Sequence, residues 1–147
     1  MADSFRIEVA TPARLLVSED AVRSQIPTTD GYIGVLPDHA ALLSELGVGV
    51  LTFVNKEDHR FVVAVREGFV EVRDNHVRVV ADEAEFGGEI DASDAERELR
   101  QAENVVVNPS AAIDIAEALI ELRHAQARID AARQAANPRE AAAETGT

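Results

Sequence analysis

The side chains best suited to metal binding or proton transfer in this 147-residue chain are its four histidines, His39, His59, His76 and His124. An imidazole can ligate a metal ion or exchange a proton near neutral pH. None has a second histidine or a carboxylate at ligand spacing on one predicted element. His59 alone follows two acids, and that cluster falls in a predicted turn, where exposed polar residues are expected. We therefore predict no metal site.

No sequence motif for a reaction mechanism accompanies these histidines. The chain lacks a Gly-x-Ser-x-Gly elbow, a phosphate loop ending in Gly-Lys-Ser/Thr and a dinucleotide Gly-x-Gly-x-x-Gly. Glu83 and Glu85 are suited to acid–base catalysis, but the sequence predicts no pocket around them. We predict that the protein is not an enzyme. A metal-dependent isomerase on a β-sandwich is an alternative that would need clustered histidines and carboxylates.

Residues 26–51 are punctuated by glycines and prolines around one histidine. Pro27, Gly31, Gly34 and Pro37 recur every few residues, which predicts tight turns joining very short strands. Apolar side chains on such a segment either plug one end of the fold or form a surface for a partner, and we expect roughly half of them to be buried. The candidate partner-binding residues are Tyr32, Ile33, Leu36, His39, Leu42 and Leu43.

The first half of the chain has the pattern of a β-protein, with alternating apolar residues and short valine-rich blocks. Turn signals separate these blocks at residues 11–12, 55–58, 67–68 and 74–75. The pattern predicts a β-sandwich or flattened barrel of short, mostly antiparallel strands. In the strand pair joined near Asn75, either Phe69 or Val70 should face the core.

After Gly87-Gly88 the apolar residues take the period of a helix. They recur at alternating spacings of three and four from 92 to 106 and again from 115 to 129. Asp91 is the predicted N-cap of the first helix, and Asn108-Pro109 the break before the second. The chain should therefore be an α+β protein, in which a sandwich is followed by an antiparallel helical hairpin with alanines between the helices.

Composition limits the possible partners. A formal net charge of −13 opposes contact with nucleic-acid phosphates and with anionic lipid. The absence of cysteine excludes a disulfide framework and suits a reducing cytoplasm. The chain opens without a signal segment and contains no apolar run approaching the roughly 20 residues of a membrane span. We predict no nucleic-acid partner, and membrane association only through another protein.

Several motifs together resemble the epsilon subunit of F-type ATP synthases, called delta in mitochondria. They are Gly-x-x-Gly-x-Leu-Pro-x-His-Ala-x-Leu-Leu at 31–43, Gly-Phe-Val-Glu-Val at 68–72 and Val-x-Val-Val-Ala-Asp-Glu-Ala-Glu at 77–85, followed by the helical hairpin. Order and spacing agree over nearly the whole chain. The resemblance implies a non-catalytic rotor subunit of the central stalk, which couples ion-driven rotation of the c-ring to ATP synthesis.

The resemblance also implies an organisation and partners. Residues 1–87 would form the sandwich that binds the gamma subunit and the c-ring, and 88–136 a regulatory hairpin that restrains ATP hydrolysis at the alpha/beta head. Residues 137–147 would be a disordered tail. The loop containing Tyr32 and His39 would face the c-ring, with Tyr32 at a position often held by an acid. The complex would be peripheral, at the cytoplasmic face of the cell membrane.

Some bacterial members of this family bind ATP between the folded helices through Ile-Asp-x-x-Arg-Ala and arginines of the second helix. The matching residues here are Ile90, Asp91, Ala95 and Arg128. Asp94 replaces the arginine of the motif and His124 the first arginine of the second helix, so like-charge repulsion opposes phosphate binding. We expect no cofactor, with ATP as a regulatory ligand only if Arg97 or Arg123 compensates. A free-standing ATP-sensing regulator is the alternative function.

Overall fold

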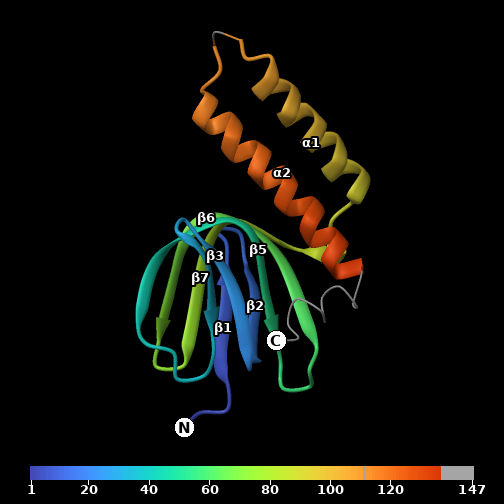
Figure 1. The fold of residues 1–147 in the computed structure, drawn as a ribbon. Helices are drawn as coiled ribbons and strands as arrows, with labels where there is room; N and C mark the ends of the chain where they lie inside the picture. The colour runs from blue at the N-terminus through green and yellow to red at the C-terminus, as the bar shows by residue number, and fades with distance from the viewer. Residues whose placement is uncertain (111, 137–147) are drawn as a thin grey trace.

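The computed structural model describes residues 1–110 and 112–136. The strands are β1 (Phe5–Ala10), β2 (Leu15–Ala21), β3 (Arg23–Thr28), β4 (Gly31–Val35), β5 (Leu42–Val54), β6 (Arg60–Arg73) and β7 (His76–Phe86). A 3-10 turn, η1 (Gly87–Glu89), leads to the helices α1 (Ala92–Val107) and α2 (Ile115–Ala136). The predicted α+β architecture, a sandwich followed by a helical hairpin, is confirmed (Figure 1). The predicted tail, 137–147, lies outside the described residues.

All seven described strands belong to one sheet that closes over itself into a sandwich, in the order β2-β1-β7-β6-β5-β3-β4. β1 and β7 run parallel, and the other neighbouring pairs are antiparallel, as predicted. Figure 1 shows the long strands β5 and β6 curving over the end of the sandwich nearest the helices. The same two strands therefore contribute to both layers.

The curve in β6 corrects a sequence prediction. The sequence predicts a turn at Glu67-Gly68, but β6 continues through both residues without ending there. Their φ angles are 50° and 133°. A Cβ at Gly68 would lie 1.9 Å from the Val80 carbonyl oxygen, so only glycine fits this bend in the strand. The sequence also predicts very short strands over residues 26–51, whereas β5, which begins at Leu42, is 13 residues long. Here glycine bends a strand without ending it.

Two clusters of buried apolar side chains hold the fold together. The first, the sandwich core, lies between the layers and is built mainly from valine, isoleucine and phenylalanine. Val70 is fully buried there, whereas Phe69 points to solvent. Of the two residues that the sequence left as candidates for the core, it is therefore Val70 that faces it. The second, the hairpin interface, lies between the outer face of β5 and β6 and the helices; it consists of Val50, Val62, Ala64, Ile90, Ala95, Ile129 and Ala131.

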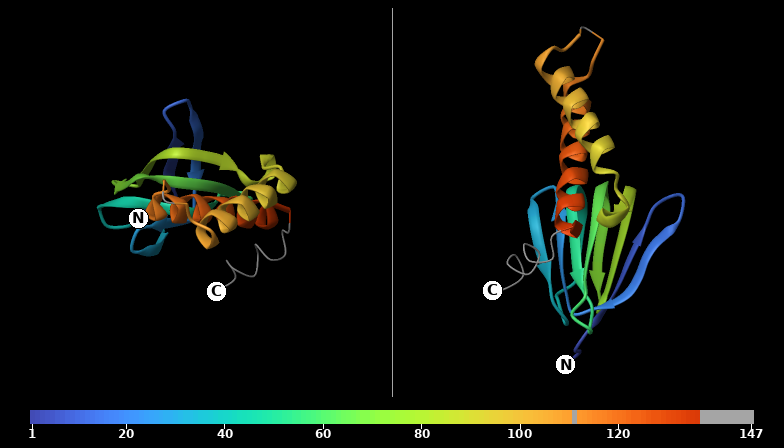
Figure 2. Two further views of the ribbon diagram at one scale, coloured as in Figure 1. Left: turned by 90° about the horizontal axis from the view of Figure 1, so that it is seen from above. Right: turned by 90° about the vertical axis from the view of Figure 1, so that its right-hand side faces the viewer.

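The helices begin at acidic caps. The Asp91 carboxylate accepts hydrogen bonds from the amides of Ser93 and Asp94, as the predicted N-cap should. The helix predicted from the period at 115–129 is confirmed, but Ile115 and Leu119, in its first turns, are exposed. Those turns project beyond the sandwich (Figure 2). The buried positions of α2 are Ala118, Ala125, Ala127, Ile129 and Ala131.

Candidate functional site

Tyr32, the first residue of the candidate partner loop, has a structural contact on the sheet. Its hydroxyl accepts a hydrogen bond from the Val50 amide at 3.0 Å, beside the place where the register between β3 and β5 shifts. A Cβ at Gly49 would lie 2.6 Å from the same hydroxyl, so glycine makes room for the tyrosine. The side chain of Tyr32 is nevertheless 58% exposed and available to a partner.

The other candidate loop residues divide between core and surface. Ile33 and Leu42 are half-buried and pack against the sandwich core. Leu36 and Leu43 are exposed, Leu43 by 71%. The Nδ1 atom of His39 lies 2.7 Å from the Ala40 carbonyl oxygen, and the residue is half-buried. The structure therefore leaves Leu36 and Leu43 free for contact and uses Ile33 and Leu42 to close the sandwich end.

Hydrogen bonds to a neighbouring turn fix the loop between β4 and β5. The Asp38 amide donates to Asn75 Oδ1 at 2.6 Å, and Asn75 Nδ2 donates to Asp38 Oδ1 at 3.0 Å. The Ala2 amide donates to Asp38 Oδ2 at 3.1 Å. The hydrogen bonds from Asn75 and Ala2 lower the pKa of the Asp38 carboxyl, because they stabilise its charged form. The exposed leucines are therefore presented by an anchored loop.

An apolar row that sequence analysis missed crosses the outer face of the sandwich. Phe69, Val80, Ala10 and Leu15 are successive cross-strand partners on β6, β7, β1 and β2. Phe69, Val80 and Leu15 are exposed, Phe69 by 58%. Leu43 lies on β5, diagonal to Phe69. A register shift in β1 between Val9 and Ala10 sets the pairing of Ala10 with Leu15, so only the ambiguity between the two faces at Phe69 hinted at the row.

Charged residues surround the hairpin interface, and Arg66 links the sheet to α2. Its guanidinium donates from Nη2 to Glu121 Oε1 at 2.6 Å and lies 3.8 Å from Glu83 on β7. The hydrogen bond with Glu121 raises the pKa of Arg66. Because the arginine is mostly buried, these contacts pull the middle of α2 onto β6.

Arg128 joins three elements at the same interface. Its Nε donates to Glu85 on β7 and its Nη1 to Glu98 on α1, the latter at 2.6 Å. Burial opposes the charge, but the hydrogen bonds to Glu85 and Glu98 outweigh it and raise the pKa of Arg128. The side chain is only 14% exposed. A single guanidinium therefore holds both helices against the sandwich.

His124 lies between these two arginines. Its Nε2 is 3.0 Å from Glu83 Oε2, and its side chain is 13% exposed. Burial lowers the pKa of His124 below its ordinary value of 6.5, Arg66 and Arg128 act in the same direction, and Glu83 and Glu121 oppose them. The ion-pair geometry alone would favour protonation, but desolvation is the larger effect. The imidazole is therefore neutral at pH 7.

The residues of the predicted nucleotide set gather at the hairpin interface, where each serves the protein itself. Ile90 and Ala95 are buried in it, Asp91 caps α1, and both donor groups of Arg128 described above are occupied by carboxylates. The adjoining cavity of about 570 Å³ is lined by four glutamates against two arginines and one histidine. The lining acids are Glu83, Glu85, Glu98 and Glu121. The chemistry of this site is internal charge pairing.

The remaining candidate chemistry is sparse in the described part of the chain. Asp94, in place of the motif arginine, pairs with Arg97 of its own helix. No group of three or more histidines and acids among residues 1–110 and 112–136 is placed to hold a metal ion. None of the helices in those ranges has the length and hydropathy needed to cross a membrane.

Comparison with known proteins identifies the family. The family described as "ATP synthase, Delta/Epsilon chain, beta-sandwich domain" matches residues 4–87. The ATP synthase epsilon chain of Solibacter usitatus is 44% identical over 129 residues, covering 88% of this chain and 96% of the relative. That of Pelotomaculum thermopropionicum is 45% identical over 98 residues, covering 67% and 72%.

A solved structure has the same fold. The matching chain, from the Euglena gracilis mitochondrial ATP synthase in a complex described as OSCP/F1/c-ring in rotational state 1, superposes with a TM-score of 0.78 at 22% identity. The match covers 90% of this chain and 82% of that one. With the family match over the sandwich and the identity to epsilon chains over most of the sequence, this chain belongs to the delta/epsilon family of ATP synthase subunits.

Proposed function

We propose that the protein is the non-catalytic central-stalk subunit of a rotary F-type ATP synthase. In this role it couples ion-driven rotation of the c-ring to ATP synthesis, and its hairpin restrains ATP hydrolysis at the alpha/beta head. Its membership in the ATP synthase delta/epsilon family carries the proposal. The chain is a peripheral subunit of the complex, and we place it on the cytoplasmic face of the cell membrane.

The sandwich supplies two surfaces for the rotor. The apolar row formed by Leu15, Ala10, Val80 and Phe69 is a suitable docking face for the gamma subunit, because exposed contiguous apolar side chains favour protein contact. The anchored loop presents Leu36, Leu43 and His39, together with the exposed ring of Tyr32, to the polar loops of the c-ring. Ile33 and Leu42 support this surface from beneath.

The hairpin supplies the regulatory element. α2 contacts the sandwich through small side chains and ion pairs, and the far turns of both helices stand clear of it (Figure 2). Such a contact buries modest apolar area, at about 25 cal/mol per Å². Docked and undocked hairpins therefore differ by only a few kcal/mol, on the scale that binding to gamma and the catalytic head can reverse.

Copurification tests the rotor assignment. The tagged protein, pulled from its own cells in mild detergent, should bring gamma, alpha, beta and the c-ring in fixed ratio. A Phe69→Ser/Val80→Ser variant should retain at least about tenfold less gamma, since central apolar contacts each contribute about 1–2 kcal/mol or more. Leu119→Ser, an exposed leucine on the hairpin, is the matched control. Recovery of the protein alone would favour the free-standing ATP-sensing regulator instead.

Truncation tests the hairpin separately. A chain ending at Gly88 retains the seven strands and lacks both helices. Reconstituted into the complex, it should raise ATP hydrolysis while the subunit ratio stays unchanged. Unchanged hydrolysis would remove the regulatory role and leave the rotor assignment standing.

A further inference from the structure

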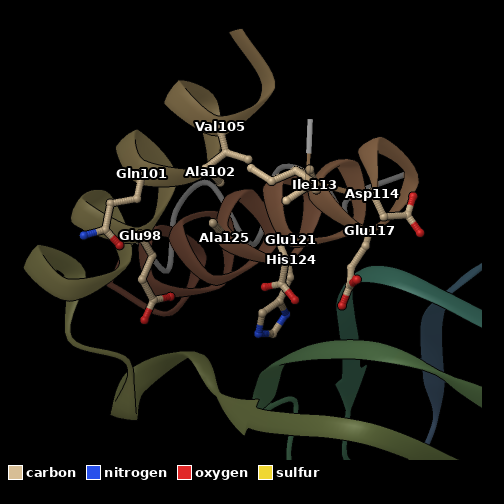
Figure 3. A pocket seen from close by; sticks show the side chains of 12 residues that line it. Glu98, Gln101, Ala102, Val105, Ile113, Asp114, Glu117, Glu121, His124 and Ala125 are labelled. Carbon is tan, nitrogen blue, oxygen red and sulfur yellow. The ribbon is translucent and has the colours of Figure 1, made fainter. Parts of the chain in front are cut away.

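A second cavity lies between the two helices and shares Glu98, Glu121 and His124 with the cavity beside the hairpin interface. Its volume is about 460 Å³, within the range of small-molecule sites. Figure 3 shows Glu98 and Gln101 of α1 at one end, and Asp114 and Glu117 at the other, beside the start of α2. No described strand contributes a lining residue.

The walls between these ends are apolar. Ala102 and Val105 come from α1, Ala118 and Ala125 from α2, and Ile113 from the connection between them. The alanines explain the space, because a leucine at any of these positions would fill part of it. Ala118 and Ala125 are buried, so the walls are not simply the outer surface of a helix.

The charges around the cavity have one sign. Glu98, Asp114, Glu117 and Glu121 line it, and no lysine or arginine does. Glu117 has no ion pair within residues 1–110 and 112–136. His124 also lines the cavity, and its Nδ1 is buried without a hydrogen-bond partner in the same ranges. Glu98 and Glu121 already pair with Arg128 and Arg66 from outside the cavity, so, among the described lining residues, the uncompensated negative charge lies at Asp114 and Glu117. That charge attracts cations and repels anions such as nucleotides.

The spacing of the acids limits the shape of the cation. Asp114 and Glu121 are seven residues apart, which corresponds to about 10 Å along a helix. Glu98 lies at the opposite end from Asp114 (Figure 3). A bare metal ion would leave the apolar walls without a contact. A linear chain of methylene groups with ammonium groups near its ends matches both the walls and the rim.

We propose that this cavity binds a linear aliphatic polyamine. The methylene groups lie along Ala102, Val105 and Ala118. One ammonium group pairs with Asp114 and Glu117, and the other shares the carboxylate of Glu98 with Arg128 at the opposite end. Because both helices form the site, the ligand favours the antiparallel hairpin over any arrangement that separates them. The proposal concerns the chain by itself and does not depend on its place in a rotor.

Nuclear magnetic resonance titration of the whole isotope-labelled chain with spermidine, at about 0.1 M salt to screen loose counter-ions, tests the site. Saturable one-to-one binding should shift the signals of Val105, Ala118 and Ala125. Glu117→Gln should weaken binding by up to about fivefold, the measured range for one exposed ion pair. Glu103→Gln, which removes the same charge from α1 outside the cavity, should leave binding unchanged.

Two results would overturn the proposal. One is equal weakening by Glu117→Gln and Glu103→Gln, or equal shifts with magnesium ions, since either means that spermidine is a general counter-ion of an acidic protein. The other is undiminished binding to a folded Ala118→Leu variant, in which the leucine occupies the cavity. If that variant fails to fold, the comparison of Glu117→Gln with Glu103→Gln decides the question alone.

Discussion

The sandwich core and the hairpin interface are built from different side chains in the same chain. The core consists mainly of branched and aromatic residues such as Ile7, Leu51 and Phe53, nearly all fully buried. The interface combines three alanines with Val50, Val62, Ile90 and Ile129, and ion pairs lie at its edge. Burial of a leucine, isoleucine or phenylalanine contributes about 1.5–3 kcal/mol, and burial of an alanine much less. The comparison indicates that the sandwich is a stably folded domain, and that the helical hairpin docked on it can be released.

Glycine substitutions should separate the two regions most strongly, beginning with the sandwich. Gly68→Ala would place a Cβ 1.9 Å from the Val80 carbonyl oxygen at a φ of 133°. We expect a loss of more than about 3 kcal/mol, enough to unfold the sandwich at room temperature. Urea denaturation followed by circular dichroism measures it. Gly31→Ala is the control, because Gly31 also has a positive φ, of 114°, but nothing lies within 4 Å of its added Cβ. It measures the backbone strain without a clash and should cost about 1 kcal/mol. Equal midpoints for the two variants would contradict the clash.

The corresponding substitution at the interface is Gly87→Ala. The added Cβ would lie 2.3 Å from the Ala131 carbonyl oxygen of α2. We expect the hairpin to undock, at a cost of about 1–3 kcal/mol, while the sandwich stays folded. Limited proteolysis should then cut the helices and spare residues 5–86. Gly88→Ala is the matched control, because nothing lies within 4 Å of its Cβ. Loss of the sandwich together with the hairpin would show that the regions are not independent.

Removal of Arg128 should have a smaller effect on docking. Arg128→Met keeps most of the apolar stem but leaves Glu85 and Glu98 without their shared partner. Docking should weaken by about 1–2 kcal/mol, less than a fully buried pair because the site is partly solvated. Hydrogen exchange of α2 amides reports it. Arg97→Met, which removes a pair within α1, should leave α2 protection unchanged. Similar losses in both variants would mean that general charge balance, not this contact, holds the hairpin.

Local sequence patterns predict the helices and strands. They do not predict contacts between side chains from segments far apart in the sequence. Asp91 was identified because an N-cap acts within one helical turn. The bend at Gly68 escaped prediction because a turn and a bend within a continuous strand both use glycine at positive φ. Leu119 has a perfect helical period but projects past the sandwich that would cover it. The partners of Arg128 come from β7 and α1, 43 and 30 residues away, so no local pattern announces them.

Acidification should weaken docking of the hairpin by less than the loss of Arg128 does. It should leave the sandwich core unaffected. In the undocked hairpin, His124 regains its ordinary pKa of 6.5, whereas burial lowers that pKa when the hairpin is docked. The undocked form therefore takes up a proton first as the pH falls. Docking is strongest above pH 6.5 and weakens below it. Hydrogen exchange of α2 at pH 7.5 and 5.5 measures the change. His124→Gln should remove this dependence, and a docking strength that rises on acidification would show that Glu83 dominates instead.

ATP should have the smallest effect of all. A ligand that binds only the docked hairpin stabilises it by about 2.7 kcal/mol at one hundred times its dissociation constant, so millimolar ATP would reveal a dissociation constant of about 10 μM in thermal unfolding. Phosphates arriving at the interface would meet four glutamates, and the guanidinium of Arg128 already binds Glu85 and Glu98. We therefore expect millimolar ATP, with magnesium held constant, to leave the unfolding of both regions unchanged. A stabilisation that Arg128→Met abolishes would show that ATP displaces those carboxylates, and would make the releasable half of the molecule a nucleotide sensor.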